Sequence, residues 1–435
     1  MYNRIRICAA AAALLATTGL ANAASRTLTI DEAVALALRS NPRLAAARAR
    51  AESGEVLATS TGRRMLPSIH VSDEAQYWNA PFAVAFGPMA FTVRDQKTNT
   101  FVAAGAQPLV GLLRANDEQT AQAEQSAAQR AQVAAGEADL RATVETQFLR
   151  VFEAQALEQI AAASIHELGD QVTVAKARLA SGVITNADLL RIEVAVANAQ
   201  QQSLEARSQA QTAHAQLFAA IGLAPADAAD FTLVEPTERL NAARNPKAAG
   251  TLGSLLPLAA QRRPELAQYA HLVSAAERQR RASGFALLPD IDFEAAYVRT
   301  DGQQFAPKNS AYVGLKANWA IWEWGATALQ RKSAVIQAEA AQRDREMLER
   351  QIESELTSSL AQGDAARGAV GSAQKAVASA EEAYRVTDAA VKAGSQTTTD
   401  LLQAQSELTQ ARLNLIRAQY ELVLSDVALA RATGK

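Results

Sequence analysis

The sequence is poor in residues that cross-link, break or rigidify a chain. Its 435 residues include one cysteine, 12 prolines, 21 glycines and only 5% aromatic residues. The cysteine, Cys8, lies in a segment that we expect to be removed, so the mature chain should contain no disulfide and no cysteine-bound metal. Few glycines and prolines, with abundant Ala, Gln, Arg and Glu, favour long helices and coiled coils over an ordinary mixed domain.

Long apolar runs, a strong net charge and catalytic motifs are missing as well. The mature chain has no run of about 18 consecutive apolar residues, so we expect no transmembrane helix, and only strands of a closed barrel could cross a membrane. A net charge of −2 argues against nucleic acid as a partner. Because no phosphate-binding loop, nucleophile elbow or metal-spaced histidine cluster occurs, we expect neither an enzyme nor a bound cofactor or metal.

The N-terminus has the three parts of a secretory signal. Basic residues Arg4 and Arg6 precede an apolar, alanine-rich run at 7–20, which ends in the small-x-small pattern Ala21-Asn22-Ala23. We therefore predict that residues 1–23 are a cleaved signal peptide. The alternative is an uncleaved membrane anchor, which the short apolar run disfavours.

The chain is a tandem duplication. Asn41-Pro42-Arg43-Leu44 corresponds to Arg263-Pro264-Glu265-Leu266, and Leu66-Pro67 corresponds to Leu288-Pro289, both 222 residues apart. The turn that begins at Gly182 corresponds to the turn at Gly394, 212 residues later. Three landmarks in the same order make chance improbable, and the change of offset indicates a shorter loop in the second half.

Each half predicts the same order of elements. The first repeat spans residues 24–222, an inter-repeat segment spans 223–262, and the second repeat spans 263–435. A capping box at Thr29 and Glu32 begins the first helix, and Asn41-Pro42, a cap followed by proline at the first helical position, should interrupt it. The first repeat is predicted to contain helix 31–65, strands 68–78 and 91–107, and helices 112–181 and 186–221. The second is predicted to contain helix 264–286, strands 290–299 and 310–321, and helices 327–393 and 398–433.

The predicted strands alternate between apolar and polar residues over about ten positions, as membrane-barrel strands do. A soluble hairpin with one wet face has the same pattern. Four tryptophans stand at the strand ends, where an aromatic ring at the lipid headgroups would explain them: Trp78, Trp319, Trp322 and Trp324. The alternative is that they are ordinary core aromatics.

The long helices carry a coiled-coil repeat. Residues 112–181 and 327–393 lack proline, and each could form one helix of roughly 100 Å. The last helix has one large and one small heptad seam, which allows close packing: Leu401, Leu408, Leu415, Leu422 and Leu429, with Ala404, Ala411, Ala418 and Ser425.

Two strands per repeat make only four per chain. A lipid-embedded sheet cannot leave its edges unpaired, so several chains must share one barrel if these strands enter a membrane.

Together these features resemble the TolC-like outer-membrane efflux family over essentially the whole mature chain. The resemblance is carried by the opening Leu28-Thr-Ile-Asp-Glu-Ala33 with Asn41-Pro42, by the Leu-Pro strand entries, and by the duplicated Gly-x-x-Thr-x-x-Asp-Leu-Leu turns. It implies a mainly α fold with a small β part. In it, a homotrimer builds one outer-membrane β-barrel from four strands per chain, and long antiparallel coiled-coil helices form a periplasmic α-barrel.

The resemblance also implies location, partners and role. The chain would sit in the outer membrane with a long periplasmic extension, and segment 223–262 would lie in an equatorial belt. It would be a passive exit duct in a tripartite efflux or type I secretion system, served by a periplasmic adaptor (membrane fusion protein) and an inner-membrane transporter. The substrate, whether drugs, metals or secreted protein, is not written in the sequence.

By the same resemblance, the duplicated turns form the periplasmic tip. The residues expected to meet an adaptor there are Arg178, Gly182, Val183, Ile184, Thr185, Gly394, Ser395, Gln396 and Thr397. Asp188 and Asp400 have two interpretations. They cap helix N-termini, or three copies of them form an acidic ring that favours cations at a closed aperture.

The competing interpretation is a periplasmic coiled-coil adaptor or scaffold that does not enter the membrane. Adaptors also contain long helical hairpins, but they lack the paired alternating strands and the duplication of the whole chain.

Overall fold

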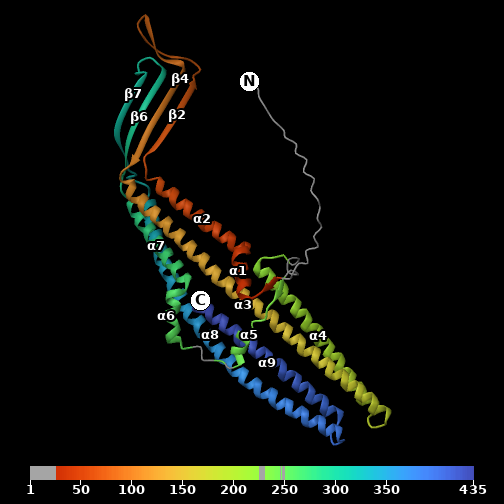
Figure 1. Ribbon diagram of the computed structural model, residues 1–435. Coiled ribbons are helices and arrows are strands. Elements are labelled where there is room, and N and C mark those ends of the chain that lie inside the picture. Colours follow the sequence, from red (N-terminus) through yellow and green to blue (C-terminus); the bar gives the residue numbers. More distant parts are fainter. Residues whose placement is uncertain (1–25, 225–230, 245, 247–249) are drawn as a thin grey trace, which may run out of the picture.

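The computed structural model describes residues 26–224, 231–244, 246 and 250–435. The predicted signal peptide lies outside these residues. The molecule is elongated, with a strand sheet at one end and two helical hairpins at the other (Figure 1). Helices α3 (Gly111–Ala180) and α8 (Ala326–Lys392) run from the sheet to the hairpin turns. In the described part of the chain, no helix is both long enough and apolar enough to cross a membrane.

The two halves repeat one order of elements. The first half contains β1 (Arg26–Leu28), α1 (Ile30–Ser40), α2 (Pro42–Arg63), β2 (Ser68–Tyr77), β3 (Phe82–Phe86), β4 (Met89–Pro108), α3 and α4 (Asn186–Ile221). The second half contains α7 (Pro264–Phe285), β6 (Asp290–Gln303), β7 (Asn309–Asn318), α8 and α9 (Thr398–Ala432). Between them lie β5 (Phe231–Leu233), α5 (Thr237–Arg244) and α6 (Leu252–Arg262).

The segment predicted as helix 31–65 consists of α1 and α2, which are divided at the expected interruption, Asn41-Pro42. Pro42 has no amide to donate, and Asn41 instead caps a new helix, its Oδ1 accepting from the amides of Arg43 and Leu44 at 2.9 and 3.2 Å. The described residues of the inter-repeat segment 223–262 form β5, α5 and α6.

The strands differ from the prediction at their ends, β3, β4 and β6 at the outer end of the sheet and β7 at the end next to the helices. β3 was not predicted, and β4 begins at Met89, before the expected residue 91, because it pairs with β3 there. β6 continues to Gln303, past the expected residue 299, since it follows β4 further out. β7 ends at Asn318, before the expected residue 321, at the point where its pairing with β6 ends.

Two joints stack helices end to end. At the first, Gly222 has a φ of 89° and lies against Asn41 and Pro42, where an added Cβ would come within 3.0 Å of their atoms. The side chain of Asn41 donates to the carbonyl of Ala220 at 2.9 Å. At the second, Gly434 lies against Arg262 and Arg263 in the same way. Each half therefore joins its last helix to the helix that precedes its strands.

The main sheet has the strand order β2-β4-β6-β7, all antiparallel, and β3 pairs only with the outer part of β4. A separate two-stranded sheet joins β1 to β5 in parallel, which places Arg26–Leu28 beside the inter-repeat segment.

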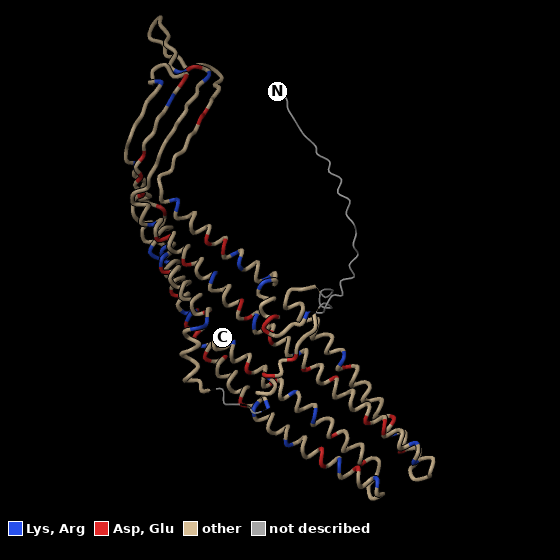
Figure 2. The backbone as a smooth tube through the Cα atoms, viewed as in Figure 1, with Lys and Arg blue, Asp and Glu red and all other residues tan. Residues whose placement is uncertain are grey.

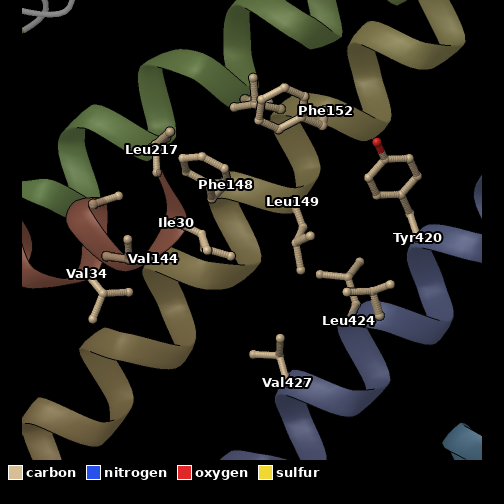
Figure 3. Packing of buried hydrophobic residues seen from close by; sticks show 14 of the residues in the cluster. Ile30, Val34, Val144, Phe148, Leu149, Phe152, Leu217, Tyr420, Leu424 and Val427 are labelled. Atoms are coloured by element: carbon tan, nitrogen blue, oxygen red, sulfur yellow. The ribbon is translucent and has the colours of Figure 1, made fainter. Parts of the chain in front are cut away.

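The largest buried cluster lies at mid-length, where α1 and α4 pack on one side of α3 and α9 packs on the other (Figure 3). Val144, Phe148 and Leu149 of α3 are fully buried there, together with Leu217 of α4. The heptad seams are confirmed over much of α9, where these members are buried: Leu401, Ala404, Leu408, Ala411, Leu422 and Ser425.

Candidate functional site

The two hairpin turns lie at the same end of the molecule, farthest from the sheet (Figure 1). Gly182 and Gly394 have φ values of 73° and 76°, a left-handed conformation that glycine adopts without strain. The amide of the residue after each glycine donates to a carbonyl in the last turn of the long helix. Val183 donates to Arg178 and Ser395 donates to Ala390, both at 2.9 Å. Each long helix thus ends in the same glycine-based cap.

A threonine and an aspartate then start the returning helix at each turn. Asp188 Oδ2 accepts from the amide of Thr185 at 3.0 Å and from its hydroxyl at 2.7 Å. Asp400 Oδ2 accepts from the amide and hydroxyl of Thr397 at 2.9 and 2.7 Å. Hydrogen bonds from the threonines lower the pKa of both carboxyl groups, so both are charged at neutral pH.

The capping interpretation of both aspartates is therefore seen directly. Each cap uses one carboxylate oxygen, Oδ2, for both of its bonds. The second oxygen of Asp188 also accepts from Arg191 Nη1 at 3.4 Å, so a cation stands beside this carboxylate. The ring interpretation stays a prediction about several chains.

Hydrogen bonds join the two hairpins within one chain. Arg178 Nη2 donates to the carbonyl of Val391 at 3.0 Å, and Arg191 Nη1 donates to the hydroxyl of Thr399 at 3.1 Å. The first of these pairs is 213 residues apart, close to the repeat offset, so equivalent levels of the two hairpins lie side by side. Sequence reasoning placed Arg178 near the tip and missed its partner, because that contact is long-range.

An apolar cluster and a cavity lie between the hairpins just behind the turns. Ala175, Leu189 and Ile192 are buried there, and Ile184 and Leu402 pack against them. The cavity has a volume of about 260 Å³, and its polar lining includes Glu167, Asp170, Arg178, Tyr384, Asp388 and Lys392.

Most of the predicted adaptor-contact residues are exposed. The turns at 181–183 and 393–397 lie open, Thr185 is exposed, and Val183 has 64% of its surface exposed. Ile184 and Arg178 are half-buried, since one packs on the apolar cluster and the other reaches α8. These two side chains therefore contribute more to holding the hairpins together than to an outer surface.

The main sheet has two chemically different faces. Residues that stand opposite each other share a face. Ile69, Gly105, Ala295 and Val313 form one cross-strand row. This apolar face also carries Val71, Phe293 and Leu315, and toward its outer end Phe101 stands in one row with the charged Asp73 and Arg299.

The next cross-strand row belongs to the opposite, polar face: His70, Ala104, Ala296 and Tyr312. The same face carries Glu74, Asp292, Glu294 and Lys316. Such a division suits strands with lipid on one side and water on the other.

Trp78 belongs to the polar face. It follows Gln76, which pairs with Thr98, and its Nε1 donates to the hydroxyl of Thr98 at 3.1 Å. The guanidinium of Arg94 lies 3.5 Å from the centre of its ring. This packing favours the alternative of a packed aromatic over a ring at the lipid headgroups.

The other three tryptophans lie beyond β7, at the junction with α8. Trp319, Trp322 and Trp324 are 59%, 74% and 86% exposed. The rings of Trp322 and Trp324 meet edge to face with centroids 5.6 Å apart. Trp324 has a φ of 55°, unusual for a bulky residue, so the backbone is strained where these rings are presented.

Residues 33–223 and 255–435 each match the model of a family described as outer membrane efflux protein. The chain belongs to the outer membrane efflux protein family. Both halves match separately, which agrees with the tandem duplication. No curated protein matches the sequence significantly.

Several solved structures share the fold of this outer membrane efflux protein. Vibrio cholerae VceC is 17% identical with a TM-score of 0.80, and the match covers 93% of this chain and 96% of that one. The Campylobacter jejuni CmeC channel is 15% identical with a TM-score of 0.78, covering 93% and 85%. The open state of the Neisseria gonorrhoeae MtrE channel is 17% identical with a TM-score of 0.74, covering 93% and 88%.

Family membership decides between the two interpretations of the sequence. The protein is an outer-membrane efflux channel with a large periplasmic helical part, and it is not an enzyme. The alternative of a periplasmic scaffold that never enters the membrane is wrong.

Proposed function

We propose that this outer membrane efflux protein is a homotrimeric, passive exit duct of a tripartite efflux or type I secretion system. The observation that supports the proposal is the arrangement of the molecule. Two equivalent helical turns lie at one end, and a sheet with one apolar and one polar face lies at the other. The four-stranded sheet needs neighbours for the outer edges of β2 and β7, and other copies of the chain can supply them.

In this proposal the tip receives a periplasmic adaptor, which connects the duct to an inner-membrane transporter. The exposed residues of the turns form the contact surface: Gly182, Val183 and Thr185 with 394–397. The contact needs the left-handed backbone at both glycines, because that conformation sets the direction in which the turns project.

Substitution of the turn glycines tests the adaptor contact. Proline holds φ near −65° and has no amide hydrogen, so Gly182→Pro or Gly394→Pro cannot keep the observed turn. We expect export to be lost and the trimer to remain on native electrophoresis. Gly169→Ala is the matched control, because an added Cβ there meets no atom within 4 Å. Normal export by both proline variants would remove the tip assignment.

A surface variant separates docking from turn folding. Val183→Asp leaves the glycine and the capping box unchanged and places a charge on the most exposed apolar side chain of the first turn. We expect export to fall while the trimer remains. Unchanged export would place the adaptor elsewhere.

Substitution of both aspartates by asparagine tests the proposed acidic aperture. Alanine would remove the helix cap together with the charge. Asp188→Asn with Asp400→Asn keeps an oxygen for the caps and removes the charges. In planar bilayers we expect the wild-type trimer to prefer cations and the double variant to lose that preference. An unchanged ion preference would leave both aspartates as helix caps only.

A further inference from the structure

The outer end of the sheet carries an apolar hairpin, made of β3, the Gly87-Pro88 turn and residues 89–94 of β4. It extends past the four-stranded sheet, on the side away from the helices (Figure 1). Residues 79–93 include no charged side chain. Phe86 and Met89 are 68% and 61% exposed, although both are large and apolar. An exposed group of this kind indicates a contact surface.

The large side chains that pair across the two strands lie on one face of the hairpin. Val84 stands opposite Phe91, and Phe86 stands opposite Met89, so these four share a face. The other face carries only small residues, since Ala83 stands opposite Thr92 and Ala85 opposite Ala90.

The pairing register shows which way the large face is directed. Phe82, two residues before Val84, pairs with Arg94 across a bulge, so Arg94 continues the large face. Arg94 also pairs with Gln303 beyond a second irregularity, where the left-handed Gly302 interrupts the alternation of β6. The guanidinium of Arg94 stacks on Trp78, which lies on the polar face of the main sheet. The apolar side chains therefore project on the side of the polar face, away from the face suited to lipid.

A charged zone separates the hairpin from the apolar rows of the sheet (Figure 2). Asp95 accepts from Gln304 Nε2 at 3.1 Å, and Arg299 pairs with Asp301 at 3.1 Å. Lipid hydrocarbon does not extend across such a zone, so bilayer burial does not explain the exposed phenylalanines.

We infer that the occupant of this face is the same hairpin in other copies of the chain. The inference rests on the trimeric channel proposed above, in which the polar face lines the lumen. Twelve strands spaced about 4.8 Å apart and tilted by about 40° give a barrel radius of roughly 12 Å. The hairpin, five residue steps from Arg94 to Met89, reaches about 17 Å.

Three hairpins are thus long enough to meet over the mouth of the barrel. Their Phe86, Met89 and Phe91 side chains then form an apolar constriction at the outer end of the duct. Such a constriction opposes the passage of water and ions, because an apolar pore of small radius dewets. The duct therefore has a second closure, distinct from the helical tip.

Cysteine cross-linking tests this contact, because the predicted mature chain contains no cysteine. Phe86→Cys places a thiol on the large face and Ala85→Cys, the matched control, places one on the small face of the same strand. Intact cells are treated with an oxidant or a short bis-maleimide, and the chain is separated under denaturing conditions. We expect Phe86→Cys to shift from the monomer to covalent dimer and trimer bands, and Ala85→Cys to remain monomeric.

Native electrophoresis of the untreated variants separates this inference from the proposed function. A trimer without cross-links at residue 86 would overturn the inference and leave the channel proposal standing, as would equal cross-linking of both variants. Quenching of a fluorophore on Phe86→Cys by spin-labelled lipid would also overturn it, in favour of lipid as the occupant. Absence of any trimer would remove the inference together with the trimeric duct.

Discussion

The joint between α9 and α7 contains a buried charge network whose effect on stability is predictable. The side chains of Arg263 and Glu265 are 5% and 14% exposed, and they pair at 3.1 Å. Arg263 also pairs with Glu355 at 2.6 Å, and Arg431 pairs with Glu265. The equivalent joint of the first half uses the neutral Asn41.

The shifted pKa of Glu265 gives the size of its contribution to the free energy of unfolding. Burial alone would raise this pKa, but hydrogen bonds from Arg263 and Arg431 outweigh burial and lower it from 4.5 to about 2. A folded-state pKa below the unfolded value means that the charged form favours folding. The difference corresponds to about 3 kcal/mol of the free energy of unfolding. This stabilisation is present above pH 4.5 and is lost as pH falls toward 2.

Glu265→Gln should therefore lower the Tm of the purified protein at pH 7, and the deficit should shrink as the pH is lowered from about 4.5 to about 2. The matched control is Glu349→Gln, which breaks the exposed i,i+4 pair with Arg345 at 3.1 Å. That change should cost only about 0.3–0.5 kcal/mol. Equal Tm losses in both variants, or a Glu265→Gln deficit that does not change with pH, would refute the reasoning.

Two further predictions concern the core and the aromatic residues. Phe148→Ala, at a fully buried position of α3, should lower the free energy of unfolding by about 3–5 kcal/mol, and thermal melting against Val183→Ala, at an exposed position, checks this. If only the tryptophans after β7 face lipid, a headgroup spin label should quench a variant that keeps only Trp324 and spare one that keeps only Trp78. Similar quenching of both variants would contradict the face assigned to Trp78.

Much of the backbone plan follows from the sequence because it depends on local signals. The capping boxes at Thr29, Thr185 and Thr397 and the left-handed glycines at both turns act within a few residues, and the structure has all of them. The heptad seams are similarly local, since their spacing alone identifies the packed face of a helix.

Features that depend on pairing were missed or misread. β3 is a five-residue strand flanked by Pro81 and the Gly87-Pro88 turn, and it forms only because β4 continues beside it. The charge network at Arg263 joins residues far apart in the sequence, so no spacing reveals it. By contrast, the face of Trp78 could have been predicted from the sequence, because Trp78 follows the polar Gln76 by two positions and alternate residues of a strand share a face.

The duplication itself separates structural from functional explanations of the tip. A residue present in both turns, such as Asp188 and Asp400, is fully accounted for by the cap that it makes in each. Arg178 has no counterpart, since Ala390 stands at the equivalent position, so its bond to Val391 distinguishes one hairpin from the other. Shared residues therefore need a test that keeps the cap and removes the charge, which is why asparagine is the informative substitution at both aspartates.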